Sequence, residues 1–317
     1  MRSDPRATQR LGSVIGERYQ IEQVIGEGGA AVVYAARDLR LGNQVALKVA
    51  LVRNPLLELR MEREARVAAN LHHPNACLVT DLGRLDDGAP YLVMELLLGM
   101  SLADRLRQAP DRRLDVAETV ELAEQVLSVL SVAHEQGVVH RDIKPENLFL
   151  ARVPGRPALV KVLDFGAATS DVEVGLTTRG NTVGTPSYMS PEQAAGEPDI
   201  DGRSDIYACA AVLFECLTGR RTFEGATSNE LLAKIASHNA PRVATFRSDV
   251  PPWIAQAIDR ALDVARDARF PTALDFLEAL GAAGQHTYDA WDVSTASLGD
   301  VPADERFEDE TERIPPR

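Results

Sequence analysis

One stretch of eight residues, from His140 to Asn147, combines side chains that could move a phosphoryl group. It reads His-Arg-Asp-Ile-Lys-Pro-Glu-Asn. The carboxylate of Asp142 could take the proton of an attacking hydroxyl, the ammonium group of Lys144 could face phosphate charge, and the amide oxygen of Asn147 could hold a magnesium ion. These residue types at this spacing indicate a site where a hydroxyl attacks a phosphate beside a metal.

A second carboxylate and a glycine-rich segment could serve the same chemistry. Asp164 lies 17 residues after Asn147 and is followed by Phe and Gly, so a metal ligand would stand on a loop anchored by an aromatic ring. Nearer the start of the chain, residues 26–34 read Gly-Glu-Gly-Gly-Ala-Ala-Val-Val-Tyr. Small residues there would let backbone amides approach phosphate oxygens closely. Taken alone, the glycine cluster is explained equally well by an ordinary hairpin turn.

The elements that must position these groups follow from the periodicity of the chain. Residues 19–25 alternate polar and apolar side chains, which predicts a strand before the glycine cluster. Residues 45–49 predict another strand, and this strand carries Lys48, 22 positions after Gly26. A lysine at this position needs a carboxylate partner from a neighbouring helix.

A helix predicted over residues 56–71 could supply that partner. Its apolar residues recur at roughly helical spacing: Leu56, Leu59, Val67 and Leu71. Three carboxylates on it are candidates for the contact with Lys48: Glu58, Glu62 and Glu64.

Further elements are predicted downstream. Residues 91–99 form an apolar strand that ends in a glycine, and Ser101 has the character of a helix N-cap. Residues 116–136 predict a long amphipathic helix. Residues 148–150 and 160–163 predict a short hairpin that directly precedes Asp164.

Taken in chain order, these motifs resemble those of protein kinases, and among them the bacterial eukaryotic-like, or Hanks-type, serine/threonine kinases. The resemblance covers about residues 18–280. Its landmarks follow in the family's order: glycine loop, strand lysine, helix glutamate, hinge, His-Arg-Asp, Asp-Phe-Gly, the segment Gly184–Glu192, a buried aspartate and a late arginine. Two residues depart from the pattern: Ala31 replaces the third loop glycine, and Ser190 replaces the usual alanine. Alanine is small enough to keep the turn but is expected to stiffen the loop, and the small change at Ser190 should not disturb function. No other departure touches the chemistry.

The resemblance implies an α+β, bilobal protein-kinase fold over residues 18–282. A small, mainly antiparallel β lobe with one key helix would occupy residues 18–95. A hinge would follow at residues 95–100, and a larger, mainly helical lobe would occupy residues 101–282.

The two ends of the chain read as less structured. Residues 1–17 have mixed charge and no periodicity, which is typical of a flexible leader. Residues 283–317 are interpreted as a disordered acidic tail, because nine acidic residues face three arginines in the last 32 positions and apolar residues are sparse.

The resemblance also implies roles for individual residues. Lys48 would position the α- and β-phosphates of ATP. Glu64 would brace it, because the family spacing to the later Leu-His-His-Pro-Asn segment selects this glutamate over Glu58 and Glu62. Asp142 would orient the substrate hydroxyl and accept its proton.

The remaining catalytic and structural residues follow from the same resemblance. Lys144 would stabilise the transferring phosphoryl group, and together with Thr185 it favours Ser/Thr over Tyr acceptors in family terms. Asn147 and Asp164 would bind Mg²⁺, with Mn²⁺ as an alternative. Four residues would have structural roles. Arg269 would pair with Glu192, Asp205 would hold the backbone of the catalytic loop, and His140 would hold the same loop without moving protons.

The ATP site implied by the family spans the glycine loop, the lysine strand, the hinge and the start of the large lobe. Met94 would lie at the back of the adenine pocket, with backbone groups of Glu95 and Leu97 at the adenine edge. The full set is Ile25, Gly26, Glu27, Gly28, Gly29, Ala30, Ala31, Val32, Val33, Ala46, Lys48, Met94, Glu95, Leu97, Ser101 and Phe149. Without the resemblance, residues 91–99 are simply a buried strand.

Regulation is expected in the segment between Asp164 and Glu192. Arg141 precedes the catalytic aspartate, and an arginine there commonly receives a phosphate of the activation loop. The candidate autophosphorylation sites are Thr177, Thr178 and, less favoured, Thr182. The alternative is that these are ordinary loop threonines.

The acidic tail admits three interpretations. Phosphorylation at Thr311, or at the upstream Ser294, Thr295 and Ser297, could recruit a phosphothreonine-reading domain. The tail could instead lie across a basic substrate groove. The favoured interpretation is a solubilising tail without a partner.

Composition narrows the class of protein. The net charge of −13 argues against nucleic acid as the main ligand. Three cysteines offer neither a disulfide framework nor metal-ligand spacing, which suits a reducing cytoplasm. No signal peptide is visible, and the longest apolar run, 206–217, is too short for a membrane span. We therefore expect a cytoplasmic protein without a membrane segment, acting on protein substrates, with a homodimer as an option for autophosphorylation.

Two other functions compete with an active Ser/Thr kinase. A catalytically weak pseudokinase could act as an ATP-binding scaffold, but the chain keeps Lys48, Asp142 and Asp164, which pseudokinases typically lose. A small-molecule kinase of similar fold is disfavoured by the intact segment from Thr185 to Glu192.

Overall fold

The computed structural model describes residues 8–28, 31–51, 54–165 and 186–281. Several predicted site residues lie outside these ranges: Gly29, Ala30, Thr177, Thr178, Thr182 and Thr185, together with the whole predicted tail. The chain divides into two compact units, residues 1–283 and 284–317, and every described residue belongs to the first of them. No helix within the described residues combines the length and the apolar character that crossing a membrane requires.

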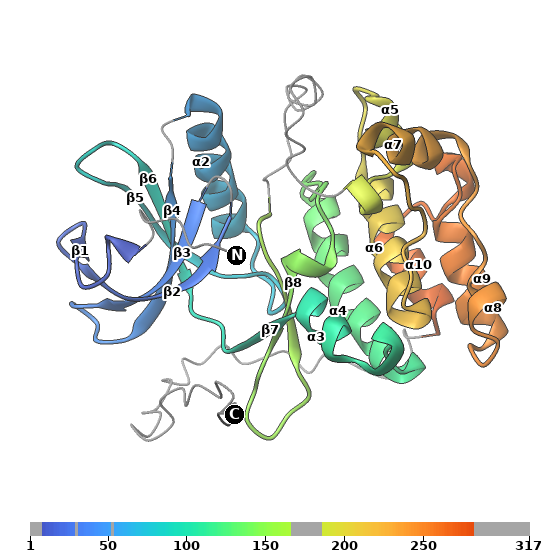
Figure 1. The fold of residues 1–317 in the computed structure, drawn as a ribbon, viewed down its shortest axis with the longest axis horizontal. Helices are drawn as coiled ribbons and strands as arrows, with labels where there is room; N and C mark the ends of the chain where they lie inside the picture. Colours follow the sequence, from blue (N-terminus) through green and yellow to red (C-terminus); the bar gives the residue numbers. More distant parts are fainter. Residues whose placement is uncertain (1–7, 29–30, 52–53, 166–185, 282–317) are drawn as a thin grey trace, which may run out of the picture. The chain divides into compact units, whose positions relative to one another are not determined.

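The small lobe is built on an antiparallel sheet of six strands in the order β1-β2-β3-β4-β6-β5 (Figure 1). The strands are β1 (Val14–Ile15), β2 (Tyr19–Glu27), β3 (Ala31–Asp38), β4 (Gln44–Ala50), β5 (Val79–Arg84) and β6 (Pro90–Glu95). Side chains alternate between the two faces of a strand. Val45, Leu47 and Val49 of β4 enter an apolar cluster on one face, so Lys48 is directed to the other.

The leader predicted over residues 1–17 extends too far. Residues Val14–Ile15 form β1 and pair with β2. Gly12 and Ser13 also exchange backbone hydrogen bonds with Ile21. These bonds satisfy the outer edge of β2, which explains why a polar segment without clear periodicity joins the sheet.

Helix α2 (Pro55–Asn70) lies where the sequence predicts a helix, but one predicted apolar position faces solvent. Met61, Glu64 and Ala68 are buried, and they recur at spacings of three and four residues. Leu59 is 62% exposed, because two residues before Met61 is about 200° around an α-helix. The buried face of α2 is therefore set by Met61 and Glu64 rather than by Leu59.

The large lobe begins with a short sheet, β7-β8-β9, and continues as helices (Figure 1). The strands are β7 (Gly99–Ser101), β8 (Leu148–Ala151) and β9 (Leu159–Val162). The helices are α3 (Leu102–Gln108), α4 (Val116–Glu135), α5 (Pro191–Ala195), α6 (Gly202–Thr218), α7 (Ser228–Ser237), α8 (Val243–Phe246), α9 (Pro252–Ala261) and α10 (Ala273–Ala279). Helix α6 is buried along nearly its whole length and forms the centre of the large apolar core.

The predicted α+β, two-lobed architecture is confirmed in its main elements. The hairpin predicted before Asp164 is β8–β9, and the long amphipathic helix is α4. Ser101 caps α3, since its hydroxyl accepts a hydrogen bond from the amide of Asp104. These elements bring the catalytic stretch 140–147 to the end of the large lobe that meets the small one.

Candidate active site

Lys48 lies at the centre of a three-residue ionic cluster. It pairs with Val33 of β3 on one side and Leu92 of β6 on the other, so its position within the sheet is fixed from both edges. Its Nζ atom contacts both carboxylate oxygens of Glu64 on α2, at 3.1 and 3.0 Å, and the Oδ1 atom of Asp164 at 2.6 Å. The sequence-based choice of Glu64 over Glu58 and Glu62 therefore agrees with the geometry.

The charges of this cluster depend on one another. Burial would lower the pKa of Lys48, but the carboxylates of Asp164 and Glu64 outweigh burial and raise that pKa above its ordinary value. Burial would raise the pKa of Asp164, and Lys48 reverses this and lowers it. Burial raises the pKa of Glu64, and the neighbouring Asp164 charge adds to the rise. The ammonium group of Lys48 thus lies between the two carboxyl groups and stabilises the charged form of Asp164.

The catalytic stretch forms a second compact group. The Nζ atom of Lys144 lies 2.9 and 2.7 Å from the carboxylate oxygens of Asp142. The side-chain amide of Asn147 donates to the carbonyl oxygen of Asp142 at 2.8 Å and to its Oδ2 atom at 2.9 Å. Because Asp142 is still about two-fifths exposed, its carboxylate is oriented by these partners and remains accessible to a substrate.

Asp205, at the start of α6, holds the backbone of this stretch from below. Its carboxylate is fully buried. It accepts hydrogen bonds from the amides of His140 at 2.8 Å and Arg141 at 2.7 Å, and it contacts Nε2 of His134 at 2.8 Å. Arg141 has a φ of 65°, a conformation that a non-glycine residue adopts only when its surroundings enforce it. The two bonds from Asp205 provide that enforcement.

His140 connects the two groups of candidate catalytic residues and is itself inaccessible to solvent. Its Nε2 atom lies 2.8 Å from the carbonyl oxygen of Leu163, and its Nδ1 atom accepts a bond from the amide of Asp142 at 3.2 Å. Its ring meets that of Phe165 edge to face, with centroids 4.8 Å apart. A fully buried imidazole with both nitrogens engaged orients its neighbours and cannot exchange protons with a substrate.

Asn147 and Asp164 form a donor set that fits a magnesium ion shared with phosphate groups. The backbone carbonyl of Asn147 accepts a bond from the amide of Leu163 at 2.9 Å, which keeps the two side chains near each other. Both hydrogen bonds of the Asn147 side chain come from its nitrogen, so its amide oxygen takes part in neither. Carboxylate and amide oxygens suit Mg²⁺, which commonly takes one or two protein ligands and completes its shell with water and substrate phosphates. No cluster of three or more His, Cys, Asp or Glu side chains that could hold a metal occurs in the described part of the chain.

The predicted adenine pocket corresponds to one face of the sheet. Ala46 lies between Ala35 and Met94 in adjacent strands, and alternation places it on the same face as Lys48. The amide of Glu95 donates to the carbonyl oxygen of Leu78 at 2.9 Å. Of the backbone groups of Glu95, the carbonyl is therefore the one that could meet a ligand.

The other predicted nucleotide-binding residues lie at the ends of β2 and β3 and around the hinge, but one of them is misplaced. Val33 lies opposite Lys48, whereas the side chain of Val32 is fully buried in the apolar cluster on the other face of the sheet, so the prediction that it contacts ATP is wrong. Ile25, Gly26 and Glu27 end β2, and Val32 and Val33 begin β3. Gly28 donates its amide to the carbonyl oxygen of Ala31 at 2.9 Å, so the loop closes with alanine at the third position. Leu97 follows β6 in the hinge. Ser101 of β7 pairs with Phe149 of β8 directly below the hinge.

A buried ion pair fixes the lower part of the large lobe, as the resemblance implied. The guanidinium of Arg269 contacts both carboxylate oxygens of Glu192 at 2.8 Å. Burial would raise the pKa of Glu192, but its bonds with Arg269 and Ser204 lower it. The departure at Ser190 has a local reason: its hydroxyl caps α5 in a reciprocal pair with Gln193.

Sequence reasoning missed several residues that tie segments together. Gln193 donates from its side chain to the carbonyl oxygen of Arg141 at 2.9 Å. Lys161 of β9 reaches Glu95 in the hinge at 2.7 Å. Tyr188 donates to the buried carboxylate of Glu215 on α6. The only signal in the sequence was a charged residue inside an apolar stretch, at Lys161 and Glu215.

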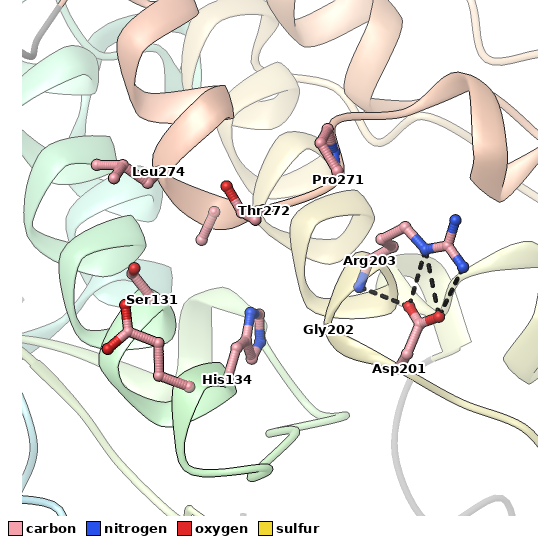
Figure 2. A pocket seen from close by; sticks show the side chains of 10 residues that line it. Ser131, His134, Asp201, Gly202, Arg203, Pro271, Thr272 and Leu274 are labelled. Carbon is pink, nitrogen blue, oxygen red and sulfur yellow. Dashed lines mark hydrogen bonds and ion pairs between the residues drawn. The ribbon is translucent and has the colours of Figure 1, made fainter.

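One cavity in the large lobe is not lined by the candidate catalytic side chains. It has a volume of about 410 Å³. It lies between the last turn of α4, the first turn of α6 and the start of α10 (Figure 2). His134 lines it and hydrogen-bonds Asp205, while the Arg203–Asp201 ion pair stands at its edge. The cavity is therefore connected to the loop 140–147 through the contact of His134 with Asp205.

A sheet lysine paired to a helix glutamate, opposite a loop with aspartate, lysine and asparagine, defines the protein kinase class. The chain belongs to the protein kinase domain family, whose model matches residues 19–280. The resemblance found in the sequence is thereby confirmed.

Relatives with assigned names agree with this family. The chain is 40% identical over 270 residues to serine/threonine-protein kinase pkn3 of Myxococcus xanthus, covering 81% of this chain and 48% of that protein. It is 36% identical over 268 residues to serine/threonine-protein kinase PrkC of Bacillus subtilis, covering 84% of this chain and 40% of that protein. The chain thus spans about half or less of the length of these relatives.

Solved structures agree with the fold. The crystal structure of a double mutant of the PknI kinase domain of Mycobacterium tuberculosis matches with a TM-score of 0.69 and 26% identity. The match covers 85% of this chain and 96% of that domain. The PknI domain and this chain therefore share their architecture through nearly the whole of that structure.

Proposed function

We propose that this protein is a serine/threonine protein kinase that transfers the γ-phosphate of ATP to Ser or Thr hydroxyls of proteins in bacterial signal transduction. The observation that carries the proposal is the joint presence of two groups, Lys48–Glu64–Asp164 and Asp142–Lys144–Asn147, linked through the buried His140. The family match and the names of the relatives support the same activity.

Asp142 orients the acceptor hydroxyl and takes its proton. Its carboxylate is exposed enough to meet a substrate and is held in place by Lys144 and Asn147. Lys144, at 2.7 Å from that carboxylate, also faces the phosphoryl group as it transfers. Because the transition state of phosphoryl transfer is charge-rich and loose, orientation and charge neutralisation provide most of the rate enhancement.

Lys48 binds the α- and β-phosphates, and Glu64 keeps its ammonium group in position. The oxygens of Asn147 and Asp164 hold Mg²⁺, or Mn²⁺ in its place. The metal, when bound, neutralises phosphate charge. The adenine occupies the face of the sheet formed by Ala46 and Met94.

The regulation that we propose uses residues identified from the sequence. Arg141 receives a phosphate placed by autophosphorylation on Thr177, Thr178 or Thr182, and Thr185 assists acceptor choice. A homodimer would allow this reaction in trans. The tail is solubilising in this proposal, and the alternative is that a phosphothreonine-reading domain docks on it after phosphorylation. The proposed location is the cytoplasm, where ATP and protein substrates are available.

Phosphate transfer from radiolabelled ATP to myelin basic protein tests the activity. We expect transfer by the wild-type chain and loss of about a thousandfold or more in Lys48→Met and Asp142→Asn, since each removes a group that contacts the reacting phosphates or hydroxyl. Arg37→Ala, on the outer sheet, serves as the control and should match the wild type. Equal transfer by the wild type and both active-site variants would refute the proposal and favour a nucleotide-binding scaffold.

A further inference from the structure

Helix α2, which carries Glu64, makes only a small apolar contact with the sheet beneath it. Met61 is buried in a cluster with Ala50 of β4 and Leu92 of β6, and Leu57 and Ala65 of α2 are partly buried against the same cluster. Next to this contact a cavity of about 110 Å³ remains between helix and sheet, lined by Glu62, Leu82, Gly83, Arg84 and Pro90. Apolar packing therefore holds α2 on the side of this cluster and leaves the side next to the cavity to polar contacts.

Arg84, the last residue of β5, bridges this gap with both of its terminal nitrogens. Its Nη1 atom lies 2.9 Å from the Oε2 atom of Glu58, and its Nη2 atom lies 2.8 Å from the Oε1 atom of Glu62. Nη1 also donates to the carbonyl oxygen of Gly88 in the turn between β5 and β6 at 3.1 Å. A planar guanidinium that holds two carboxylates one helical turn apart fixes both the distance and the rotation of the helix.

The two carboxylates on α2 and the catalytic glutamate point to different sides of the helix. Glu62 and Glu64 are two residues apart, which is about 200° of rotation in an α-helix. Glu62 thus faces β5 while Glu64 faces Lys48, and α2 packs against β5 and β6 between these contacts (Figure 1). A small rotation of α2 that releases the Arg84 contacts would also move Glu64 away from Lys48.

We propose that Arg84 is a positioning residue for catalysis: its two ion pairs with Glu58 and Glu62 hold α2 where Glu64 reaches Lys48. This inference rests on the proposed kinase function. Arg84 acts through Glu64 and makes no contact of its own with Lys48 or Asp164. The ion pair with Glu58 is the main cause that raises the pKa of Arg84, so the guanidinium remains charged at every working pH.

The first experiment compares Arg84→Ala with a matched control, Arg37→Ala. Arg37 lies in the same sheet, is similarly exposed (46% against 49%) and pairs with Glu22 at 2.7 Å, but its partner is on β2 and not on α2. Exposed ion pairs are individually weak and are screened by salt. We therefore expect kcat/KM for ATP to fall about fivefold in Arg84→Ala and to stay unchanged in Arg37→Ala, with the difference shrinking at about 0.5 M salt.

The second experiment separates positioning from a general loss of stability. In a Glu64→Gln background, Arg84→Ala should reduce the residual activity no further. The ion pairs of Arg84 then have no Glu64 carboxylate left to hold against Lys48. The charge-swapped pair, Arg84→Glu with Glu62→Arg, should recover most of the activity that either single change removes. Equal losses from Arg84→Ala in both backgrounds, or no loss at all in the wild-type background, would overturn the inference.

A third measurement is independent of catalysis. Amide hydrogen exchange over residues 55–70 should speed up in Arg84→Ala and not in Arg37→Ala, since the helix then opens from the sheet more often. If the wild-type chain transfers no phosphate, the proposed function fails while this measurement still decides whether Arg84 holds α2. If amide hydrogen exchange over α2 is the same in Arg84→Ala as in the wild type, the inference that Arg84 holds α2 is wrong.

Discussion

Removing the carboxylate of Glu192 should expose how strongly the large lobe depends on one buried ion pair. In Glu192→Ala the guanidinium of Arg269, whose side chain is completely buried, loses both oxygens that it contacts at 2.8 Å. Breaking one side of a buried pair costs about 3–5 kcal/mol, because an uncompensated charge remains in the interior. Arg269 keeps hydrogen bonds to the carbonyl oxygens of Asp263, Val264 and Arg203. We therefore expect the lower end, about 3 kcal/mol.

For a domain of this size that loss corresponds to a decrease in melting temperature of roughly 6–12 °C. Thermal unfolding followed by circular dichroism measures it. Asp267→Ala is the control: it removes an ion pair with Arg203 in the same region, but Asp267 is 90% exposed, and exposed pairs contribute about 0–1 kcal/mol. Glu192→Gln, which keeps the shape without the charge, should fall between the two. A Glu192→Ala protein that melts within 2 °C of Asp267→Ala, roughly the shift expected for a surface pair, would refute this account of the pair.

Three other perturbations test separate parts of the structure. Asp205→Asn should lower kcat by roughly 10- to 100-fold, since misplacement of the catalytic loop is sufficient for such losses. A kcat within twofold of wild type would show that the hydrogen bonds of Asp205 with the amides of His140 and Arg141 are dispensable. The hydrogen bond from Arg18 lowers the pKa of Asp38 to about 2, below its unfolded value, so the stability that this group contributes is present above about pH 4 and is lost as pH falls toward 2. Acid unfolding of wild type should therefore be steeper between those pH values than that of Asp38→Asn, and identical curves would contradict the shift. Chelation with EDTA should abolish phosphate transfer, and excess Mg²⁺ or Mn²⁺ should restore it; transfer that persists without a divalent ion would remove the assignment of Asn147 and Asp164.

The catalytic constellation was accessible from sequence because it is built from short local motifs. Residues 140–147 contain an acid, a lysine and an asparagine within one turn of loop, and local spacing alone brings them together. The Lys48–Glu64 contact joins positions 16 residues apart on different elements. It could be predicted only because the family spacing selected one glutamate among three.

Other contacts could not be derived from spacing or composition. Arg84 finds Glu58 and Glu62 across the gap between a strand end and a helix, and exposed charges of this kind carry no periodic signal. The edge pairing of Val14–Ile15 with β2 belongs to a segment whose sequence reads as a leader. The exposed position of Leu59 shows that the pattern of apolar residues in a helix of mixed composition does not predict which face packs against the sheet.

The sequence by itself determined the class of protein and the candidate residues for its chemistry. The order of the motifs identifies the family without any knowledge of distances. The side chains of Asp, Lys and Asn in one short loop indicate phosphoryl transfer beside a metal ion. Tertiary structure decided how those residues are held: Lys48 shared between two carboxylates, Asp205 binding two consecutive amides, and Arg84 fixing the helix that carries Glu64. These arrangements depend on contacts between segments far apart in the chain, and the energy of such contacts depends on distance and burial, which only the folded chain specifies.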